Sequence, residues 1–207
     1  MSDLNWCQNK NWNDSIERSF MEKLRRARHK GHYLRIQAST LASSYPEVAL
    51  RLLDQFFALG GKVEWAQGYY DRATALFALG RVSETIAAYE DALAREAEFP
   101  SIKTYAYLDL PFLIATTPIP DRFDQAERLL DEHKSRLTFP VDRFRWYAAA
   151  ALIAESRADT RTAAERAAQA LAEANREHSG FHYHPDVGLV SGHYGNLIEN
   201  LRSIARR

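Results

Sequence analysis

Four of the seven histidines in this sequence lie near its carboxyl end, within sixteen residues: His178, His182, His184 and His193. Imidazole nitrogens are common ligands of transition metals, and the nearby Asp186 could add a carboxylate oxygen. His182 and His184 are therefore the candidate metal ligands. The aromatic neighbours and Pro185 favour a different interpretation, in which this segment packs across the fold and its imidazoles bond to the backbone. We therefore predict no bound metal and no cofactor.

Residues that could act as a nucleophile or as an acid–base pair do not form a recognised pattern. Ser191 is the fourth residue of the segment 188–192, whereas the G-x-S-x-G elbow needs the serine third. Cys7 has no obvious base beside it. Glu90 and Asp91 are adjacent, so on a helix their side chains point about 100° apart and do not converge. The chain also lacks Gly-rich phosphate loops and the H-E-x-x-H zinc motif, so we predict no catalytic residues and no enzyme activity.

A run of basic residues near the amino end is a local asymmetry of charge. We call it the basic patch: Lys23, Arg25, Arg26, Arg28 and Lys30. It could be a solvated helix face, or it could meet an acidic protein or the acidic outer face of residues 83–98 in a second copy. Nucleic acid is disfavoured as a partner, because only Phe20 and Tyr33 lie among the basic residues as rings for base stacking.

The overall composition limits the compartment and the class of partner. The 207 residues include 27 Lys and Arg against 27 Asp and Glu, and this balance argues against a general nucleic-acid binder. A single cysteine permits no intramolecular disulfide, which is typical of a reducing compartment. The first ten residues lack the pattern of a signal peptide, and no apolar run is long enough to span a membrane. We therefore expect a cytoplasmic protein with a single domain over residues 1–207.

Apolar residues that recur at spacings of three and four predict helices along most of the chain. Alanine, the best helix former, occurs 31 times, whereas Gly and Pro stand mainly between the helical segments. Each of four predicted hairpins has a first helix, at about residues 32–43, 64–79, 102–116 and 141–157. The second helices are predicted to begin at Pro46, Ser83, Asp121 and Thr160. The predicted fold class is all-α.

Equivalent positions in the four second helices recur at similar intervals. Ala49, Thr85, Ala126 and Ala163 are separated by 36, 41 and 37 residues, which is typical of a helical repeat. The longest interval contains Pro111, which removes a backbone hydrogen bond from a helix. We therefore predict a kink or break near 109–111.

The second hairpin is similar to a tetratricopeptide repeat (TPR). In residues 66–100, Gly80 falls at the turn between the helices, Tyr89 at the bulky position of the second helix, and Pro100 at the end of the unit. Thr85 departs from the family pattern, which has a small alanine there. The other three hairpins match the pattern loosely.

The resemblance to the TPR family covers residues 30–177 and implies an architecture for the whole chain. It implies a right-handed solenoid of about four α-hairpins. Residues 1–13 would be a mobile segment, 14–29 an N-terminal capping helix, and 178–207 an extended segment followed by a C-terminal capping helix. A different α-hairpin solenoid or an irregular helical bundle is the alternative.

Proteins of this family usually bind peptides or protein segments on the concave surface lined by the first helix of each hairpin. The resemblance places ten candidate residues on that surface: Leu34, Arg35, Gln67, Tyr70, Asp71, Thr74, Leu108, Phe112, Arg145 and Leu152. This mixed set suits an apolar helix or an extended segment, and it lacks the Lys, Asn and Arg clamp of chaperone-binding members. The resemblance therefore implies a non-enzymatic interaction module, of adaptor or scaffold type, whose partner is another protein of unknown identity.

Several alternatives stay open at the level of sequence. A bacterial immunity-type protein that occludes a toxin would have the same size and the same lack of catalytic motifs. A metal-binding protein or enzyme built on the carboxyl-terminal histidines is a competing class. The repeats could also form a homodimer, and the chain's own carboxyl-terminal segment could fill the groove.

Overall fold

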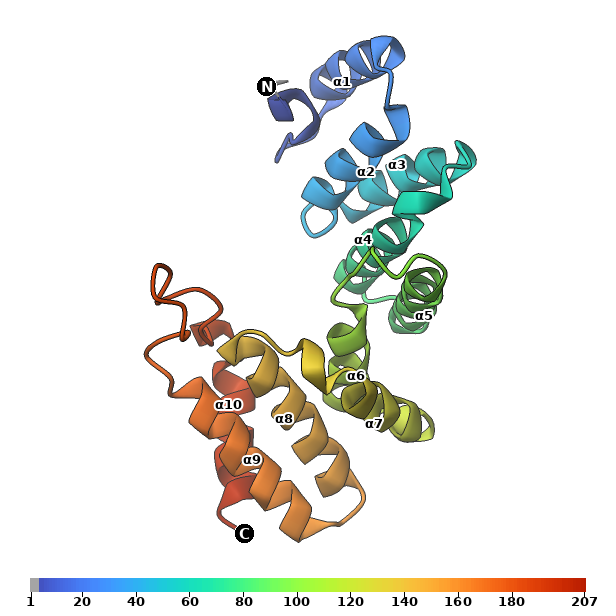
Figure 1. Cartoon of the computed structure of the whole chain (residues 1–207). Helices are drawn as coiled ribbons and strands as arrows, with labels where there is room; N and C mark the ends of the chain where they lie inside the picture. Colours follow the sequence, from blue (N-terminus) through green and yellow to red (C-terminus); the bar gives the residue numbers. More distant parts are fainter. Residues whose placement is uncertain (1–3) are drawn as a thin grey trace. The chain divides into compact units, whose positions relative to one another are not determined.

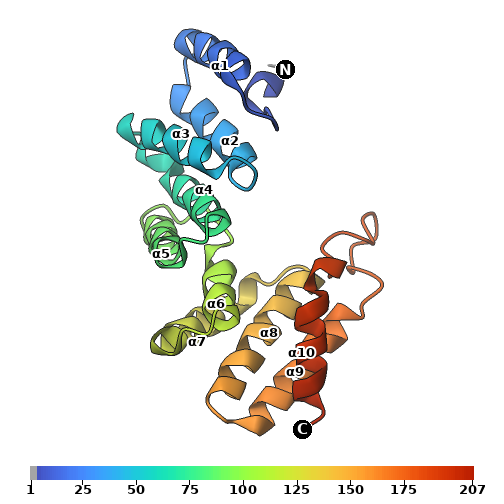
Figure 2. The same cartoon turned by 180° about the vertical axis from the view of Figure 1, so that it is seen from behind.

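The computed structural model describes residues 4–207 and is helical through most of that range. Ten α-helices pack as sequential antiparallel pairs, and no strand occurs among these residues (Figures 1 and 2). The all-α class predicted from the sequence is thereby confirmed. The chain divides into two compact units, Met1–Ala106 and Tyr107–Arg207, where the sequence analysis predicted one domain. No helix in the described range is long and apolar enough to cross a membrane.

Unit 1 contains five α-helices: α1 (Asp14–Arg26), α2 (Lys30–Leu41), α3 (Pro46–Ala58), α4 (Trp65–Ala78) and α5 (Val82–Glu98). Pro46 lies in the first turn of α3, where its missing N–H costs no helical bond. Gly80 has φ +71°, a left-handed conformation that glycine adopts without strain, and it makes the turn between α4 and α5. Helix α2 packs on both α3 and α4, and α4 packs on α5. The first helices of the two hairpins, α2 and α4, are therefore neighbours.

The first described residues pack against the rest of unit 1. A 3₁₀ turn spans Leu4–Cys7, and the thiol-bearing side chain of its last residue is fully buried in the core. The backbone N–H and the side-chain Nδ2 of Asn9 donate to Oε1 of Gln37, at 3.0 and 2.9 Å. In the segment 1–13, which was expected to be mobile, Trp6, Cys7 and Asn9 therefore contact the rest of unit 1. Residues 1–3 lie outside the described range.

Two glycines allow helices to approach the ring of Phe56 on α3 from opposite edges. A Cβ atom on Gly68 of α4 would lie 2.5 Å from ring carbon Cε1 of Phe56, far inside van der Waals contact. A Cβ atom on Gly31 of α2 would lie 3.5 Å from Cδ2 at the other edge, which is an ordinary contact. Gly68 is therefore required for the close packing of α4 on α3.

Helix α6 (Ala106–Thr116) begins at the boundary: its first residue ends unit 1, and the rest of the helix belongs to unit 2. Unit 2 also contains α7 (Phe123–Glu132), α8 (Pro140–Ser156), α9 (Thr160–Ala174) and α10 (Gly195–Ala205). Helices α8 and α9 meet through alanines that have no exposed surface: Ala148, Ala151, Ala163, Ala167 and Ala170. Small side chains permit close approach but add little apolar volume. Leu201 and Ile204 of α10 supply that volume, and both views place α10 along α8 and α9 (Figures 1 and 2).

Two local predictions for this half of the chain were wrong. Helix α6 contains Pro111 and continues through it to Thr116, so the break expected near 109–111 does not occur. The segment after α9 was expected to be extended. It forms turns instead, in which the N–H of Ser179 donates to the carbonyl of Pro185 at 2.7 Å.

Candidate functional site

Arg35 is the centre of a charged cluster on the adjoining faces of α2 and α4. Its Nε donates to Oε2 of Glu64 at 2.8 Å, and its Nη1 donates to Oδ2 of Asp71 at 3.3 Å. Glu64 also lies 3.1 Å from Nδ1 of His32. Arg35 and Asp71 were predicted from the sequence to share a surface, and the structure brings them into direct contact. Glu64 and His32 were not predicted as members of this group.

The two carboxylates that share Arg35 differ in their pKa. Burial raises the pKa of Asp71 from 3.8 to about 6, against the opposing charge of Arg35 and a hydrogen bond from Ser39. Burial also acts to raise the pKa of Glu64, but hydrogen bonds from Arg35 and His32 outweigh it and hold the pKa below its usual value. Glu64 receives the shorter bond from Arg35, so Asp71 is the less compensated carboxylate.

The other candidate residues of unit 1 surround this cluster with uncharged side chains. Leu34 is buried, whereas Gln67, Tyr70 and Thr74 keep part of their surface exposed. The hydroxyl of Thr74 donates to the carbonyl of Tyr70 at 3.2 Å. Oε1 of Gln67 is buried and has no hydrogen-bond partner among the described residues. We call the half-exposed set Arg35, Gln67, Tyr70 and Thr74 the inner face of unit 1.

The candidate residues of unit 2 are covered by the chain itself. Arg145 donates to Asp109 at 2.5 Å, and its guanidinium stacks over the ring of Phe112 at 4.6 Å. Leu108 has no exposed surface. Phe112 and Leu152 pack in the same cluster as α10.

Tyr194, just before α10, lies against this group of side chains. Its ring is 5.0 Å from that of Phe144 and 6.2 Å from that of Phe112. Burial raises the pKa of the Tyr194 hydroxyl, and the charge of Arg145 acts in the opposite direction. In unit 2 the chain's own carboxyl-terminal segment therefore contacts Phe112, one of the residues that the sequence analysis assigned to a partner-binding surface.

Both Arg–Asp pairs join residues that are 36 positions apart in the sequence. Arg35 of α2 pairs with Asp71 of α4, and Asp109 of α6 pairs with Arg145 of α8. Asp109 was missed in the sequence analysis. The signal that could have identified Asp109 is a pair of opposite charges at equivalent positions of consecutive first helices.

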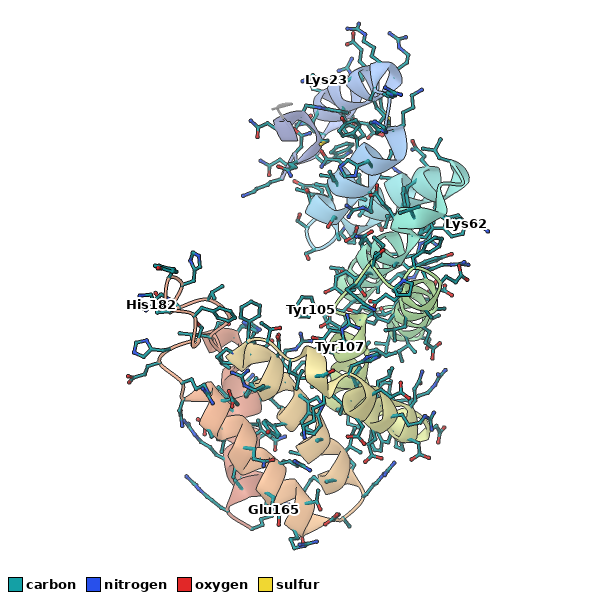
Figure 3. The ribbon with its side chains drawn as sticks, in the orientation of Figure 1. Lys23, Lys62, Tyr105, Tyr107, Glu165 and His182 are labelled. Carbon is teal, nitrogen blue, oxygen red and sulfur yellow. The ribbon has the colours of Figure 1, made fainter. Side chains whose placement is uncertain are left out.

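The basic patch is exposed and largely uncompensated. Arg26 pairs with Glu22 at 2.7 Å, one helical turn earlier. The other four members have no carboxylate within ion-pair distance in the part of the chain that the structure describes: Lys23, Arg25, Arg28 and Lys30. Figure 3 shows Lys23 extending from α1. The positive charge of the patch is therefore available to a partner.

The histidines near the carboxyl end do not converge. No group of three or more His, Cys, Asp or Glu side chains within residues 4–207 is arranged to hold a metal ion. His182 extends from the loop after α9 (Figure 3), beside Tyr183, whose surface is 86% exposed. Nδ1 of His193 bonds to the hydroxyl of Ser191. The loop is held together instead by Ser179, whose hydroxyl donates to the carbonyl of His184 at 2.8 Å.

Comparison with known proteins adds no relative to these observations. No protein family, curated protein or solved structure was found to match the chain.

Proposed function

We propose that this chain is a non-enzymatic protein–protein interaction module built of TPR-like hairpins, and that it binds a protein segment on the inner face of unit 1. The repeat character is supported by the sequence intervals and by the two Arg–Asp pairs that both span 36 residues. In a helical repeat, equivalent residues of consecutive first helices lie side by side. The hairpins then act as a rigid support for one binding surface.

The difference between the two units carries the proposal. Phe112 and Leu152 of unit 2 pack in the cluster that contains α10, and the ring of Phe112 also lies beside that of Tyr194. In unit 1, Tyr70 and Thr74 remain partly exposed. The inner face of unit 1 is thus exposed to a partner, whereas the candidate residues Phe112 and Leu152 of unit 2 are packed with the carboxyl-terminal segment.

The chemistry of the inner face favours an uncharged segment. Arg35, the cation of this face, already contacts two carboxylates, and Asp71 has little exposed surface. A charged ligand would have to compete with these ion pairs. Tyr70 provides an aromatic surface and Thr74 a small polar one, which suit an apolar or mildly polar helix or extended strand.

A bulky substitution on the inner face tests the proposal. Thr74→Arg adds a long side chain to the exposed side of α4, whereas Thr116→Arg makes the same change at an exposed position at the end of α6. Untagged protein from the native host would be used to identify a co-purifying partner, and its affinity would be measured by calorimetry. We expect Thr74→Arg to weaken binding roughly tenfold or more and Thr116→Arg to leave it unchanged. Equal affinities for all three proteins would contradict the proposal.

A further inference from the structure

A second surface of unit 1 lies at the opposite end of α2 from its junction with α3. A cavity of about 400 Å³ opens between the start of α2, the end of α3 and the connection to α4. This volume is within the range of about 300–1,000 Å³ that is usual for binding pockets. Phe56, Leu59 and Val63 form its apolar part, and Arg28, His29 and Lys30 line it from the start of α2. We call it the α2–α3 pocket.

The apolar part of the α2–α3 pocket is unusually exposed. Leu59 is 54% exposed and Val63 is 59% exposed, although both are large aliphatic residues. Gly60 and Gly61 lie between Leu59 and Val63 in the chain and bring no side chain to cover them, and a Cβ atom on either glycine would meet open space. Exposed apolar surface beside polar residues is typical of a binding site.

Positive charge exceeds negative charge around the α2–α3 pocket. No acidic residue occurs between Glu22 and Glu47, while the basic patch lies within that interval. Arg28 and Lys30 of the patch line the pocket and have no ion-pair partner among residues 4–207. Glu64 also lines the pocket, but Arg35 and His32 already hold its carboxylate. The surroundings of the apolar surface therefore attract negative charge.

We infer that the α2–α3 pocket docks an acidic protein segment, which inserts one large apolar side chain between Leu59, Val63 and Phe56. Asp or Glu residues on either side of that apolar residue would then reach Arg28 and Lys30. The inference rests on the proposed function, and it assigns the basic patch to the same partner as the pocket. Nucleic acid fits less well because Phe56, the aromatic ring of the pocket, is only 4% exposed and offers no face for base stacking.

Gly31 provides a way to fill the pocket without disturbing the fold. A Cβ atom there would lie 3.5 Å from Phe56 and 3.7 Å from Leu59, both ordinary contacts, so Gly31→Leu places its side chain in the α2–α3 pocket. Gly195→Leu, at the first position of α10, is the matched control because a Cβ atom there meets open space. Thermal melting of both variants checks that each one folds.

Charge reversal tests the contribution of the basic patch separately. Arg28→Glu with Lys30→Glu inverts the charge beside the pocket. Arg128→Glu with Arg206→Glu makes the same change of total charge in unit 2, at exposed arginines that have no ion-pair partner in the described residues. Only the first pair is expected to affect the acidic segment, and increasing salt should weaken the wild-type interaction in the same way.

The probe is a phage-displayed library of random peptides, selected on the immobilised full chain. We expect enriched peptides to carry one large apolar residue flanked by Asp or Glu. A synthetic copy of one of them should bind Gly31→Leu and the Arg28/Lys30 reversal at least roughly tenfold more weakly than wild type, and both controls unchanged. Absence of enrichment, enrichment of basic or uncharged peptides, or equal binding by all variants would overturn the inference. So would displacement of the peptide by a tighter-binding random RNA oligomer.

The variant Thr74→Arg separates this inference from the proposed function. If enriched peptides lose affinity for Thr74→Arg but not for Gly31→Leu, they bind the inner face. The α2–α3 pocket is then rejected while the proposed function is supported. If they lose affinity for Gly31→Leu but not for Thr74→Arg, the pocket is supported and the inner face is not the binding surface.

Discussion

Asp71 combines deep burial with an incomplete ion pair, and its contribution to the stability of the fold therefore depends on pH. Its pKa is about 6 in the folded protein against 3.8 for an ordinary aspartate, so the folded state binds its proton more tightly than the unfolded state does. The resulting stabilisation is fully present below pH 4 and is lost as the pH rises through 6. The size of the shift corresponds to about 3 kcal/mol.

The variant Asp71→Asn isolates this effect because asparagine does not titrate, while Arg35, Glu64, His32 and Ser39 remain. We expect the free energy of unfolding of wild type, minus that of Asp71→Asn, to fall by about 2.5 kcal/mol between pH 4 and pH 7, because part of the stabilisation is gained only below pH 4. Urea denaturation followed by circular dichroism at several pH values measures it. A difference for Asp71→Asn that grows with pH would contradict the argument.

The packing of α4 on α3 depends on Gly68, although glycine is a poor helix former. Glycine within a helix costs about 1 kcal/mol relative to alanine, so Gly68→Ala would stabilise an isolated helix. In the protein the added Cβ would meet Phe56 at 2.5 Å and the ring of Phe57 at 3.2 Å. Phe56 is buried and cannot move aside easily, and overpacking typically costs about 1–3 kcal/mol.

We therefore expect Gly68→Ala to destabilise the protein by about 1 kcal/mol in spite of its better propensity. Gly31→Ala places its Cβ at ordinary contact distance from the same ring, so it should be neutral or stabilising by up to about 1 kcal/mol. Chemical denaturation of the two alanine variants provides the comparison. If Gly68→Ala is as stable as Gly31→Ala, the close approach of α4 to Phe56 does not limit the packing.

The sequence predicted the helices better than their contacts. Apolar periodicity and the positions of Pro46 and Gly80 place most helix boundaries within a few residues, because these signals are local. Helix α9 begins at Thr160 as predicted, but α5 begins at Val82 rather than Ser83, and α7 begins at Phe123 rather than Asp121. Such differences arise because several neighbouring residues can meet the first free N–H groups of a helix.

The candidate site was predicted only in part, for a reason that concerns tertiary structure. Arg35, Asp71 and Arg145 were implied by the resemblance to the TPR family, but Glu64 lies outside the α-helices and joins the cluster only through the fold. The pocket beside Gly31 depends on the path of the connection between α3 and α4, which carries no helical period. Surfaces of this kind are visible only when the elements are packed.

The division of the molecule into two units also escaped the sequence analysis. The interval from Thr85 to Ala126, which is the longest of the three, spans the boundary between Ala106 and Tyr107. The sequence analysis attributed this longer interval to Pro111. The interval also coincides with the boundary between the two compact units. Repeat spacing reports the length of each hairpin, whereas the division into units depends on which helices share a core.

The whole chain has an even balance of charge, which affects how copies of it interact. It has no net charge at pH 7 with neutral histidines, and its isoelectric point is about 7.1. Molecules without net charge repel one another least, while the basic patch remains able to attract acidic surfaces of other copies. Below its isoelectric point the chain carries a net positive charge that grows as the pH falls, and repulsion between copies increases.

We therefore expect the second virial coefficient, measured by light scattering in low salt, to be lowest near pH 7 and clearly more positive near pH 5.5. Added salt should reduce the difference, because it screens the repulsion between molecules. A coefficient that falls between pH 7 and pH 5.5 would contradict control by net charge. It would instead indicate that protonation of a particular group, such as Asp71, creates an attractive contact between copies.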